Sequence, residues 1–277
     1  MRLPILLLLF LLSVSPLADV LELEGEPRQG ALLFGRTEQG ARVLHDGEKV
    51  PVSPDGDFVI GFEREAPAIS KLEVELPDGR VLVRELQVKS RQYAIQRIDG
   101  LPPSKVTPRT KEELERIQRE AALVKRARSR IDPRSDYVGG FQWPVHGPIT
   151  GVYGSQRILN GKPRRPHYGV DIAGPVGKPV RAPADGIVTL VHPDMFFSGG
   201  TLIMDHGHGL SSTFIHLSRI LAREGERVRQ GQVVAEMGAT GRATGSHLDW
   251  RMNLRGKRVD PQTVVKPMKI DKTEKSQ

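Results

Sequence analysis

Apolar and polar residues alternate along the first third of the chain, in short runs separated by Gly, Pro and Asp. The runs ARVLH, KVPV, FVIGF, KLEVEL and RVLVREL have the period of two that is typical of strands. Asp-Gly pairs punctuate them, and Pro77-Asp78-Gly79 between the last two runs predicts a hairpin. We therefore expect a small β-sandwich over residues 19–100.

One segment instead repeats its apolar residues at helical spacing. Residues 101–135 begin with a Pro-rich stretch that predicts a linker, and Thr110 and Glu113 then have the spacing of a capping box. We expect one connecting helix that ends before Pro133. One face of this helix carries an apolar stripe that comprises Leu114, Ile117, Ala121, Val124 and Ile131. We expect the stripe to pack on a neighbouring domain; the alternative is that it binds a partner.

From residue 136 to 265 glycine becomes dense and the apolar runs stay short. KPVRAPADGIVTLV, GTLIMDHG, STFIHLS and GQVVAEMG read as successive strands, so the fold class is mainly β with a second, larger β-sheet domain. The charged remainder, residues 266–277, predicts a disordered tail.

The N-terminus has the layout of a secretory signal peptide. Arg2 precedes an apolar run from Leu3 to Leu12, and Pro16 follows among small residues, which predicts a signal peptide over residues 1–18. An uncleaved anchor is the alternative, and no later apolar run is long enough to cross a bilayer. We expect an exported protein.

Composition restricts the chemistry further. The chain has no cysteine, which excludes disulfides, a lipid-modified cysteine and thiolate metal ligands, so a metal site must use His, Asp or Glu. A net charge of +8 suits anionic partners such as cell-wall polymers, acidic peptides or lipid headgroups. Nucleic acid is disfavoured, because aromatic residues that stack on bases make up only 5% of the chain.

Three short patterns carry the candidate chemistry. In TGSHLDW, His247 and Asp249 point to one face of a strand while Leu248 points to the core. In RRPHYGVDIAG, His167 and Asp171 are four residues apart, and Gly169 allows a bend that brings them together. In FIHLS, His216 lies in a strand. Each pattern alone also fits an ordinary surface or core residue.

Together, in this order, the patterns resemble the lysostaphin/LytM-type zinc murein endopeptidases. The resemblance covers about residues 141–255, from WPVHGPITGVYGS through PHYGVDIAGPVGKPVRAPADGIVTLV and GGTLIMDHGHGLSSTFIHLSRI to GERVRQGQVVAEMGATGRATGSHLDW. It implies a LytM-like peptidase domain, one zinc ion, the peptide stems of peptidoglycan as substrate and a periplasmic location.

The resemblance also implies roles for individual residues. His167 and Asp171 correspond to zinc ligands, and His216 and His247 to catalytic histidines. Asp249 occupies the position of the family's third ligand, which is a histidine. Aspartate can bind zinc at about 2.0–2.2 Å, although an oxygen-rich site also suits harder ions such as Mn²⁺.

The departure at Asp249 leaves two functions open. One is a zinc endopeptidase that cuts peptide crosslinks in peptidoglycan. The other is a catalytically impaired relative that binds the cell wall and activates other murein hydrolases. The N-terminal domain could bind glycan, bind a partner protein, or cover the active-site groove as an inhibitor, and its residues do not favour any one of these roles.

The other histidines of this region and one basic segment are expected in turns and loops. His206 and His208 are expected at a hairpin tip, and His146 and His192 in loops without chemistry. The basic segment 155–165 is expected to be either a solvated loop or a wall of the substrate groove.

Overall fold

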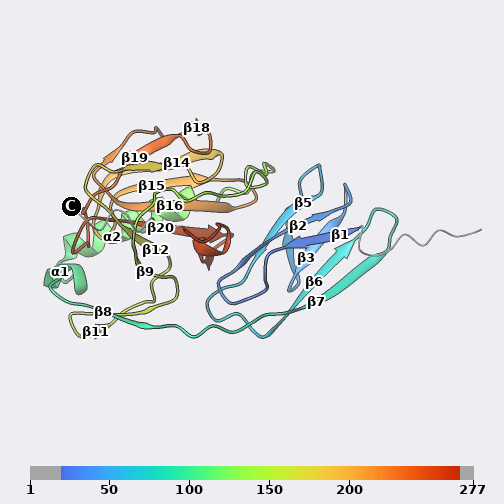
Figure 1. The fold of residues 1–277 in the computed structure, drawn as a ribbon, viewed down its shortest axis with the longest axis horizontal. Coiled ribbons are helices and arrows are strands. Elements are labelled where there is room, and N and C mark those ends of the chain that lie inside the picture. The colour runs from blue at the N-terminus through green and yellow to red at the C-terminus, as the bar shows by residue number, and fades with distance from the viewer. Residues whose placement is uncertain (1–19, 269–277) are drawn as a thin grey trace, which may run out of the picture.

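The computed structural model describes residues 20–268 and is mainly β, which confirms the predicted fold class. The predicted signal peptide lies outside the described residues. The N-terminal part (Figure 1) consists of two small sheets, and side chains from both enclose one hydrophobic cluster that includes Phe58, Ile60, Leu72 and Val74. The predicted hairpin joins β6 (Ile69–Glu75) and β7 (Val81–Gln87). One sheet has the order β1 (Leu21–Glu24), β2 (Leu32–Thr37), β5 (Asp57–Gly61); the other has the order β4 (Glu48–Val50), β3 (Arg42–His45), β6 (Ile69–Glu75), β7 (Val81–Gln87).

The larger C-terminal part is built on one sheet. Its order is β18-β14-β15-β16-β20-β12-β9, with β21 paired to β20. The sheet is made of β9 (Ile149–Gly151), β12 (Val170–Ala173), β14 (Gly186–Met195), β15 (Gly199–Asp205), β16 (Leu210–Leu217), β18 (Arg227–Val228), β20 (His247–Leu254) and β21 (Lys257–Val259). A second sheet contains β13 (Pro179–Arg181), β19 (Val233–Glu236) and β17 (Arg219–Ile220), and a 3-10 helix, η2, spans Pro261–Thr263.

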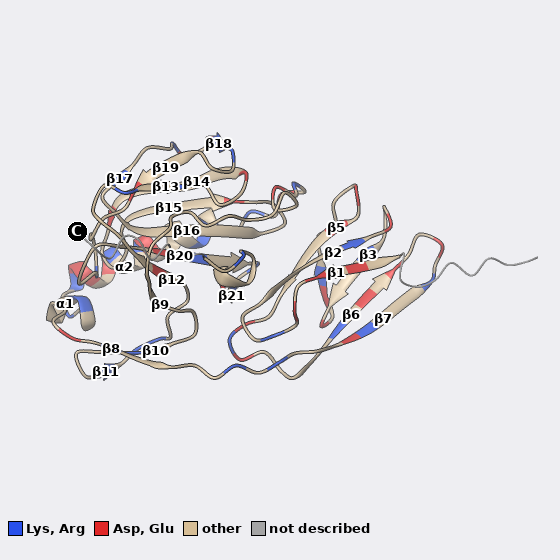
Figure 2. Cartoon of the chain, in the orientation of Figure 1, with Lys and Arg blue, Asp and Glu red and all other residues tan. Residues whose placement is uncertain are grey.

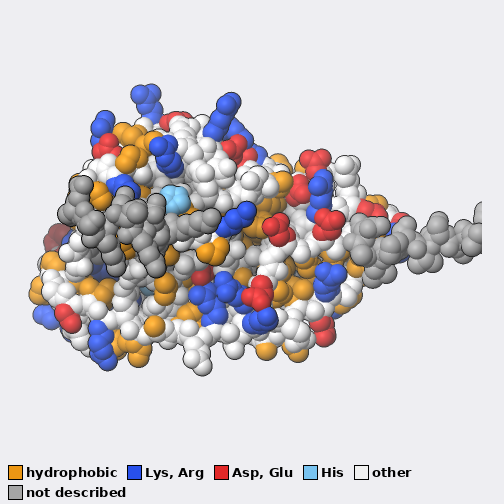
Figure 3. Space-filling view, viewed as in Figure 1, with side chains coloured by type: hydrophobic (Ala, Val, Ile, Leu, Met, Phe, Trp, Pro, Cys, Tyr) orange, Lys and Arg blue, Asp and Glu red, His pale blue; other side chains and the backbone are white. Residues whose placement is uncertain are grey.

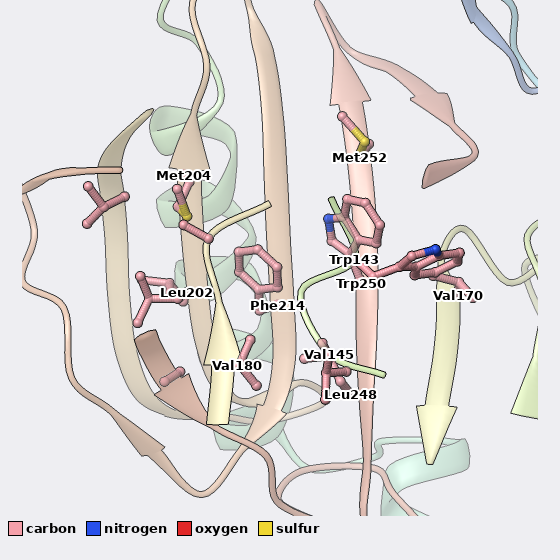
Figure 4. Close-up of a cluster of buried hydrophobic side chains, with 14 of the residues drawn as sticks. Trp143, Val145, Val170, Val180, Leu202, Met204, Phe214, Leu248, Trp250 and Met252 are labelled. Carbon is pink, nitrogen blue, oxygen red and sulfur yellow. The ribbon is translucent and has the colours of Figure 1, made fainter. Parts of the chain in front are cut away.

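The core of this part lies on one face of β20. Leu248, Trp250 and Met252 alternate along β20 and are fully buried among side chains such as Phe214 and Trp143 (Figure 4). The residues between them, His247, Asp249 and Arg251, therefore point to the opposite face. This alternation is the one that the sequence predicted, and it places the polar motif outside the apolar core.

The connecting segment contains one predicted helix and one that was not predicted. The predicted helix, α2 (Lys111–Ala127), begins with the expected capping box between Thr110 and Glu113. It ends at Ala127, before Pro133 as expected, and beyond it the carbonyl of Asp132 accepts from the N–H of His208 (2.8 Å). Ile131 is therefore outside the helix and 59% exposed. A short helix, α1 (Pro103–Val106), lies in the predicted linker.

Helix α2 packs on the C-terminal part through a face that shares only Val124 with the predicted stripe; Leu114 and Ile131 of that stripe are exposed. Leu123, Val124 and Ala127 contact a cluster that includes Leu190 and Ile203 on β14 and β15. Of the two expected roles, packing on a neighbouring part of the chain is the one observed for the helix.

The basic segment 155–165 is a hairpin rather than an irregular loop. Its strands are β10 (Gln156–Leu159) and β11 (Lys162–Pro163), and β8 (Ile95–Ile98) pairs in parallel with β10. In Figure 1 the chain after β7 runs along the lower edge of the molecule to reach this hairpin. The last part of the range predicted for the small sandwich therefore pairs with the C-terminal hairpin instead.

The two halves share packing. Leu32 and Val59 from the N-terminal sheets belong to the C-terminal hydrophobic cluster, and the rings of Phe34 and Tyr137 stack at 5.6 Å. Such contacts make one half depend on the other, so the domain boundaries remain an interpretation.

The expected disordered tail is wrong at its start. The carbonyl of Lys266 accepts a hydrogen bond from Nε1 of Trp143 (2.8 Å), which holds the chain against the core. Residues 269–277, the rest of the predicted tail, lie outside the described part.

Charge and apolar surface are widely spread. Lys and Arg occur on both halves (Figure 2), and one group of basic side chains lies near the middle of the face in Figure 3.

Between residues 20 and 268, no helix has the length and apolar character that crossing a membrane requires.

Candidate metal centre

Two buried carboxylates lie directly opposite each other on neighbouring strands. Asp171 on β12 and Asp249 on β20 are cross-strand partners, and both are buried. Like charges in this position repel each other, and a buried charge is costly unless it is paired. The site therefore requires positive charge close to both carboxylates.

His167 completes the cluster from the segment before β12. Its N–H donates to the carbonyl of Ser155 (2.8 Å) and its carbonyl accepts from the N–H of Gly154 (2.7 Å), which fixes the residue. Nε2 of His167 lies 3.1 Å from Oδ1 of Asp171, and Nδ1 lies 3.9 Å from Oδ2 of Asp249. One ligating atom from each of the three residues lies within 4.8 Å of the others.

Gly169 has a different role from the expected one. Its backbone does not take a positive φ, so conformational freedom is not what the position requires. A Cβ atom there would instead lie 2.4 Å from Oδ1 of Asp249 and 2.7 Å from the carbonyl oxygen of Trp250. Glycine allows β20 to approach the segment that carries His167.

Several atoms of the cluster have no hydrogen-bond partner. Both ring nitrogens of His167 and Oδ1 of Asp171 are buried and have no hydrogen-bond partner among the described residues; Nε2 and Oδ1 are close to each other but not aligned for a hydrogen bond. Leaving such an atom unsatisfied costs about 1–3 kcal/mol. Two ligands of one tetrahedral zinc ion lie about 3.3 Å apart, close to the 3.1 Å between Nε2 of His167 and Oδ1 of Asp171. The residues fit a divalent metal ion.

Two arginines hold the outer sides of the carboxylates. Arg157 on β10 donates from Nη2 to Oδ2 of Asp171 (2.6 Å), which leaves Oδ1 free. Arg251 donates from Nε to Oδ1 of Asp249 (2.9 Å) and from Nη2 to Oδ2 (2.5 Å). Burial raises the pKa of Asp249, but Arg251 and His167 outweigh burial and hold the pKa well below its usual range. Both carboxylates are therefore available as charged ligands.

Sequence reasoning missed these two arginines. Arg251 follows His247 and Asp249 on the same face of β20, so the period of two that placed those residues also predicts its position. No sequence signal pairs Arg157 with Asp171, because their contact depends on how the hairpin folds over β12.

Two histidines lie side by side next to the cluster. The ring centroids of His216 and His247 are 4.8 Å apart, and Nε2 of His247 lies 3.8 Å from Oδ1 of Asp171. Nδ1 of His216 donates to the carbonyl of Thr240 (2.7 Å), and Nδ1 of His247 donates to that of Gly245 (2.9 Å). Because a carbonyl can only accept, Nε2 of each neutral ring keeps its lone pair.

The environment of His216 keeps its ring neutral. Burial lowers its pKa to about 4, far enough that the ring is uncharged near neutral pH. Its φ of 67° is in the left-handed region, a conformation that costs free energy in a residue other than glycine. Strain of this kind concentrates at functional sites.

A cleft of about 320 Å³ gives access to the cluster. It is lined by Asp171, His216 and His247, and on its outer side by Gln96 of β8 and Arg157 of β10. The hairpin that contains the basic segment therefore forms a wall of the cleft, the second of the two expected roles.

The remaining histidines serve other purposes. His206 and His208 lie in the turn between β15 and β16, as expected, and are buried. His206 bonds to the carbonyl of Asp185 and to Ser212, and His208 bonds to Tyr137. His146 and His192 do not line the cleft.

Comparison with known proteins agrees with this fold. The model of peptidase family M23 matches residues 165–261. A solved structure of a Pseudomonas aeruginosa protein assigned to peptidase M23 is 34% identical, with a TM-score of 0.66, and the match covers 85% of this chain and 93% of that one. The chain belongs to peptidase family M23.

Curated relatives match over shorter stretches. Peptidoglycan DD-endopeptidase ShyA of Vibrio cholerae serotype O1 is 37% identical over 105 residues, which is 37% of this chain and 24% of ShyA. ShyB of the same organism is 38% identical over 131 residues, 47% of this chain and 28% of ShyB. A Pseudomonas aeruginosa lipoprotein NlpD/LppB homolog is 37% identical over 124 residues, 45% of this chain and 39% of that protein. The chain thus spans less than half the length of each.

Proposed function

We propose that the chain is a zinc-dependent endopeptidase that hydrolyses peptide crosslinks of peptidoglycan in the periplasm. The observation that carries the proposal is the set of buried, unpartnered atoms on His167 and Asp171 beside Asp249. The substrate class is supported by the relatives named peptidoglycan DD-endopeptidases. The predicted signal peptide supports export.

The proposed mechanism assigns the metal to one set of residues and proton transfer to another. His167, Asp171 and Asp249 would hold the ion, with Zn²⁺ preferred and Mn²⁺ as the alternative. When bound, such an ion makes water nucleophilic and polarises the scissile carbonyl. His216 and His247 each present a free Nε2 atom, so one accepts the proton of the attacking water.

The histidine pair then serves the leaving group. The proton taken from the water is given to the leaving amine, either by the ring that accepted it or, after transfer between the adjacent rings, by the other ring; in its protonated form that ring also stabilises the oxyanion. The two rings are close enough to exchange these roles. Arg157 and Arg251 orient the ligand carboxylates and keep them charged.

One observation favours the second candidate, a wall-binding protein without turnover. Both oxygens of Asp249 accept from Arg251, and Oδ2 of Asp171 accepts from Arg157. The arginines already offset the charge of both carboxylates. If the arginines take the place of a metal ion, the chain would bind peptidoglycan and activate other murein hydrolases without cutting the substrate itself.

Release of soluble fragments from purified peptidoglycan separates the two candidates. The full chain would be incubated with Zn²⁺, with Mn²⁺ and with a chelator, beside the Asp249→Ala and His216→Ala variants. We expect release that the chelator abolishes, that added metal restores and that both variants lose. No release with either metal would favour the wall-binding protein, and release that survives the chelator would contradict a metal mechanism.

A further inference from the structure

A second hollow lies next to the metal centre, under helix α2. It has a volume of about 620 Å³ and runs between α2 and the β20–β21 hairpin. We call it the α2 groove. Its size is that of a typical small-ligand site. Much of its wall is apolar and comes from Ile117, Ala121, Val124, Met195 and Phe197.

The rest of the α2 groove is basic and lacks acidic partners. It contains Lys125, Arg128, Arg255 and Arg258, and none of these forms an ion pair within residues 20–268. The acidic residue that lines the groove, Glu120, is bound to Arg116 (2.7 Å) and to the N–H of Phe196 (2.8 Å). The groove therefore carries an uncompensated positive charge beside an apolar wall.

Arg128 is the centre of this charge. Its Nη2 donates to Oγ1 of Thr213 (2.7 Å), but its Nε is buried and has no hydrogen-bond partner among the described residues. Burial, with Arg258 and Arg251 nearby, lowers its pKa to about 9, as a buried cation without a counter-ion requires. A buried charge of this kind is unfavourable unless an anion joins it.

Arg258 and Arg255 differ in how far they are available. Nη1 of Arg255 donates to the carbonyl of His208 (3.0 Å), and Nη2 donates to the carbonyl of Val59 (2.9 Å). Arg258 stacks over the ring of Tyr168, with 5.5 Å to its centroid, and keeps its donors free of ion pairs. Arg128 and Arg258 are thus the two guanidinium groups that a ligand would meet.

The α2 groove and the metal cleft share a wall. Phe197 and Ser198 line the groove, and the carbonyl of Ser198 accepts from the N–H of His216 (2.8 Å). Arg242, which lines the metal cleft, lies over the ring of Phe197 with 4.8 Å to its centroid. The two hollows are therefore neighbours, separated by the segment that contains Phe197 and Ser198.

We propose that the α2 groove binds the carboxylate of a peptide. Arg128 and Arg258 would donate hydrogen bonds to the carboxylate, and the apolar wall of the groove would contact the peptide's neighbouring side chains. Guanidinium groups bind carboxylates through paired, charge-assisted hydrogen bonds. The assignment of this carboxylate to the peptidoglycan stem rests on the proposed function. The groove would then select stems that carry a free carboxylate at a fixed distance from the scissile bond.

The test compares two probes with the full chain in the presence of a chelator, so that the probe cannot bind through a metal ion. N-acetyl-Leu-Ala has a free carboxylate, and its C-terminal amide does not. Titration calorimetry should give at least a tenfold lower dissociation constant for the carboxylate, with a difference that shrinks as salt is added. Equal affinity for the two probes would overturn the proposal.

Variants locate the binding. Arg258→Gln and Arg128→Gln should each remove the preference for the carboxylate without lowering the melting temperature, since each removes an uncompensated charge. Arg229→Gln is the matched control, because it removes the same charge from an exposed position, and it should keep the preference. A preference that survives in Arg258→Gln would overturn the assignment even if Arg128→Gln failed to fold. Because no turnover is measured, failure here leaves the endopeptidase proposal intact.

Discussion

Asp249 and Arg251, two residues apart on strand β20, form a two-bond ion pair at the metal centre, with 2.9 Å from Nε to Oδ1 and 2.5 Å from Nη2 to Oδ2. The pair faces Asp171 across the sheet. A carboxylate in place of an imidazole adds one negative charge to the site, and the adjacent guanidinium compensates it. Arg251 therefore offsets the charge that Asp249 brings to the buried cluster.

The first prediction concerns Arg251. In the presence of a chelator, Arg251→Gln should lower the free energy of unfolding by about 3–5 kcal/mol, because it leaves a buried carboxylate without its partner. With saturating Zn²⁺ the loss should be smaller, since the ion replaces part of the lost charge. Urea unfolding with and without metal measures both. Arg229→Gln, at an exposed position, should change stability by less than about 0.5 kcal/mol. An equal loss with and without Zn²⁺ would argue against an ion at this site.

The second prediction separates the two kinds of histidine. His216→Ala and His247→Ala should lower the rate of peptidoglycan hydrolysis by about 10²–10⁴-fold, the usual contribution of proton transfer. Both should still bind one equivalent of Zn²⁺, whereas His167→Ala should not. Activity assays and metal analysis on the same preparations test the division. Loss of metal from His216→Ala would place that ring among the ligands instead.

The third prediction concerns the space at Gly169. An alanine there would place Cβ 2.4 Å from Oδ1 of Asp249 and 2.7 Å from the carbonyl of Trp250, so β20 must move away from His167. Gly169→Ala should cost about 1–3 kcal/mol of stability, as overpacking does, and should weaken Zn²⁺ binding. Gly139→Ala is the matched control, since no atom lies within 4 Å of its added Cβ. Equal metal affinity of the two variants would show that the close approach does not position the ligand.

The fourth prediction concerns stability in acid. Burial lowers the pKa of His206 to about 4, and Nδ1 of the neutral ring donates to the carbonyl of Asp185 while Nε2 accepts from Ser212. The unfolded chain binds this proton near pH 6.5, so the folded state loses stability as the pH falls from about 6.5 to about 4, by about 3 kcal/mol.

The matching variant isolates this contribution. His206→Gln cannot titrate, so its stability should fall less than that of the unaltered chain over the same pH range. Unfolding free energies at pH 7 and pH 4 give the comparison. Parallel pH profiles for the two proteins would show that His206 is not buried as a neutral ring.

Sequence patterns predicted the parts of the fold that depend on local order. The alternation in TGSHLDW placed Leu248 in the core and His247 and Asp249 on the other face, as the structure has them. Thr110 and Glu113 marked the start of α2, because a capping box involves only adjacent turns of chain.

Features that depend on distant contacts were not predictable in this way. The hydrogen bond between Asp132 and His208 joins residues far apart in the sequence, and β8 pairs with β10, which lies about 60 residues further along the chain. The ion pair between Arg157 and Asp171 likewise requires the folded hairpin. At the metal centre, the resemblance to known endopeptidases supplied the candidate residues, and the structure supplied their neighbours.

The most direct test of the account is the Zn²⁺ affinity of the full chain and of three variants at position 249, measured by competition with a chromogenic chelator. The unaltered chain should bind one ion, Asp249→Ala and Asp249→Asn should bind it on the order of 100-fold or more weakly, and Asp249→His should retain tight binding. If Asp249→Ala binds Zn²⁺ as tightly as the unaltered chain, Asp249 is not a ligand and the metal centre proposed here is wrong.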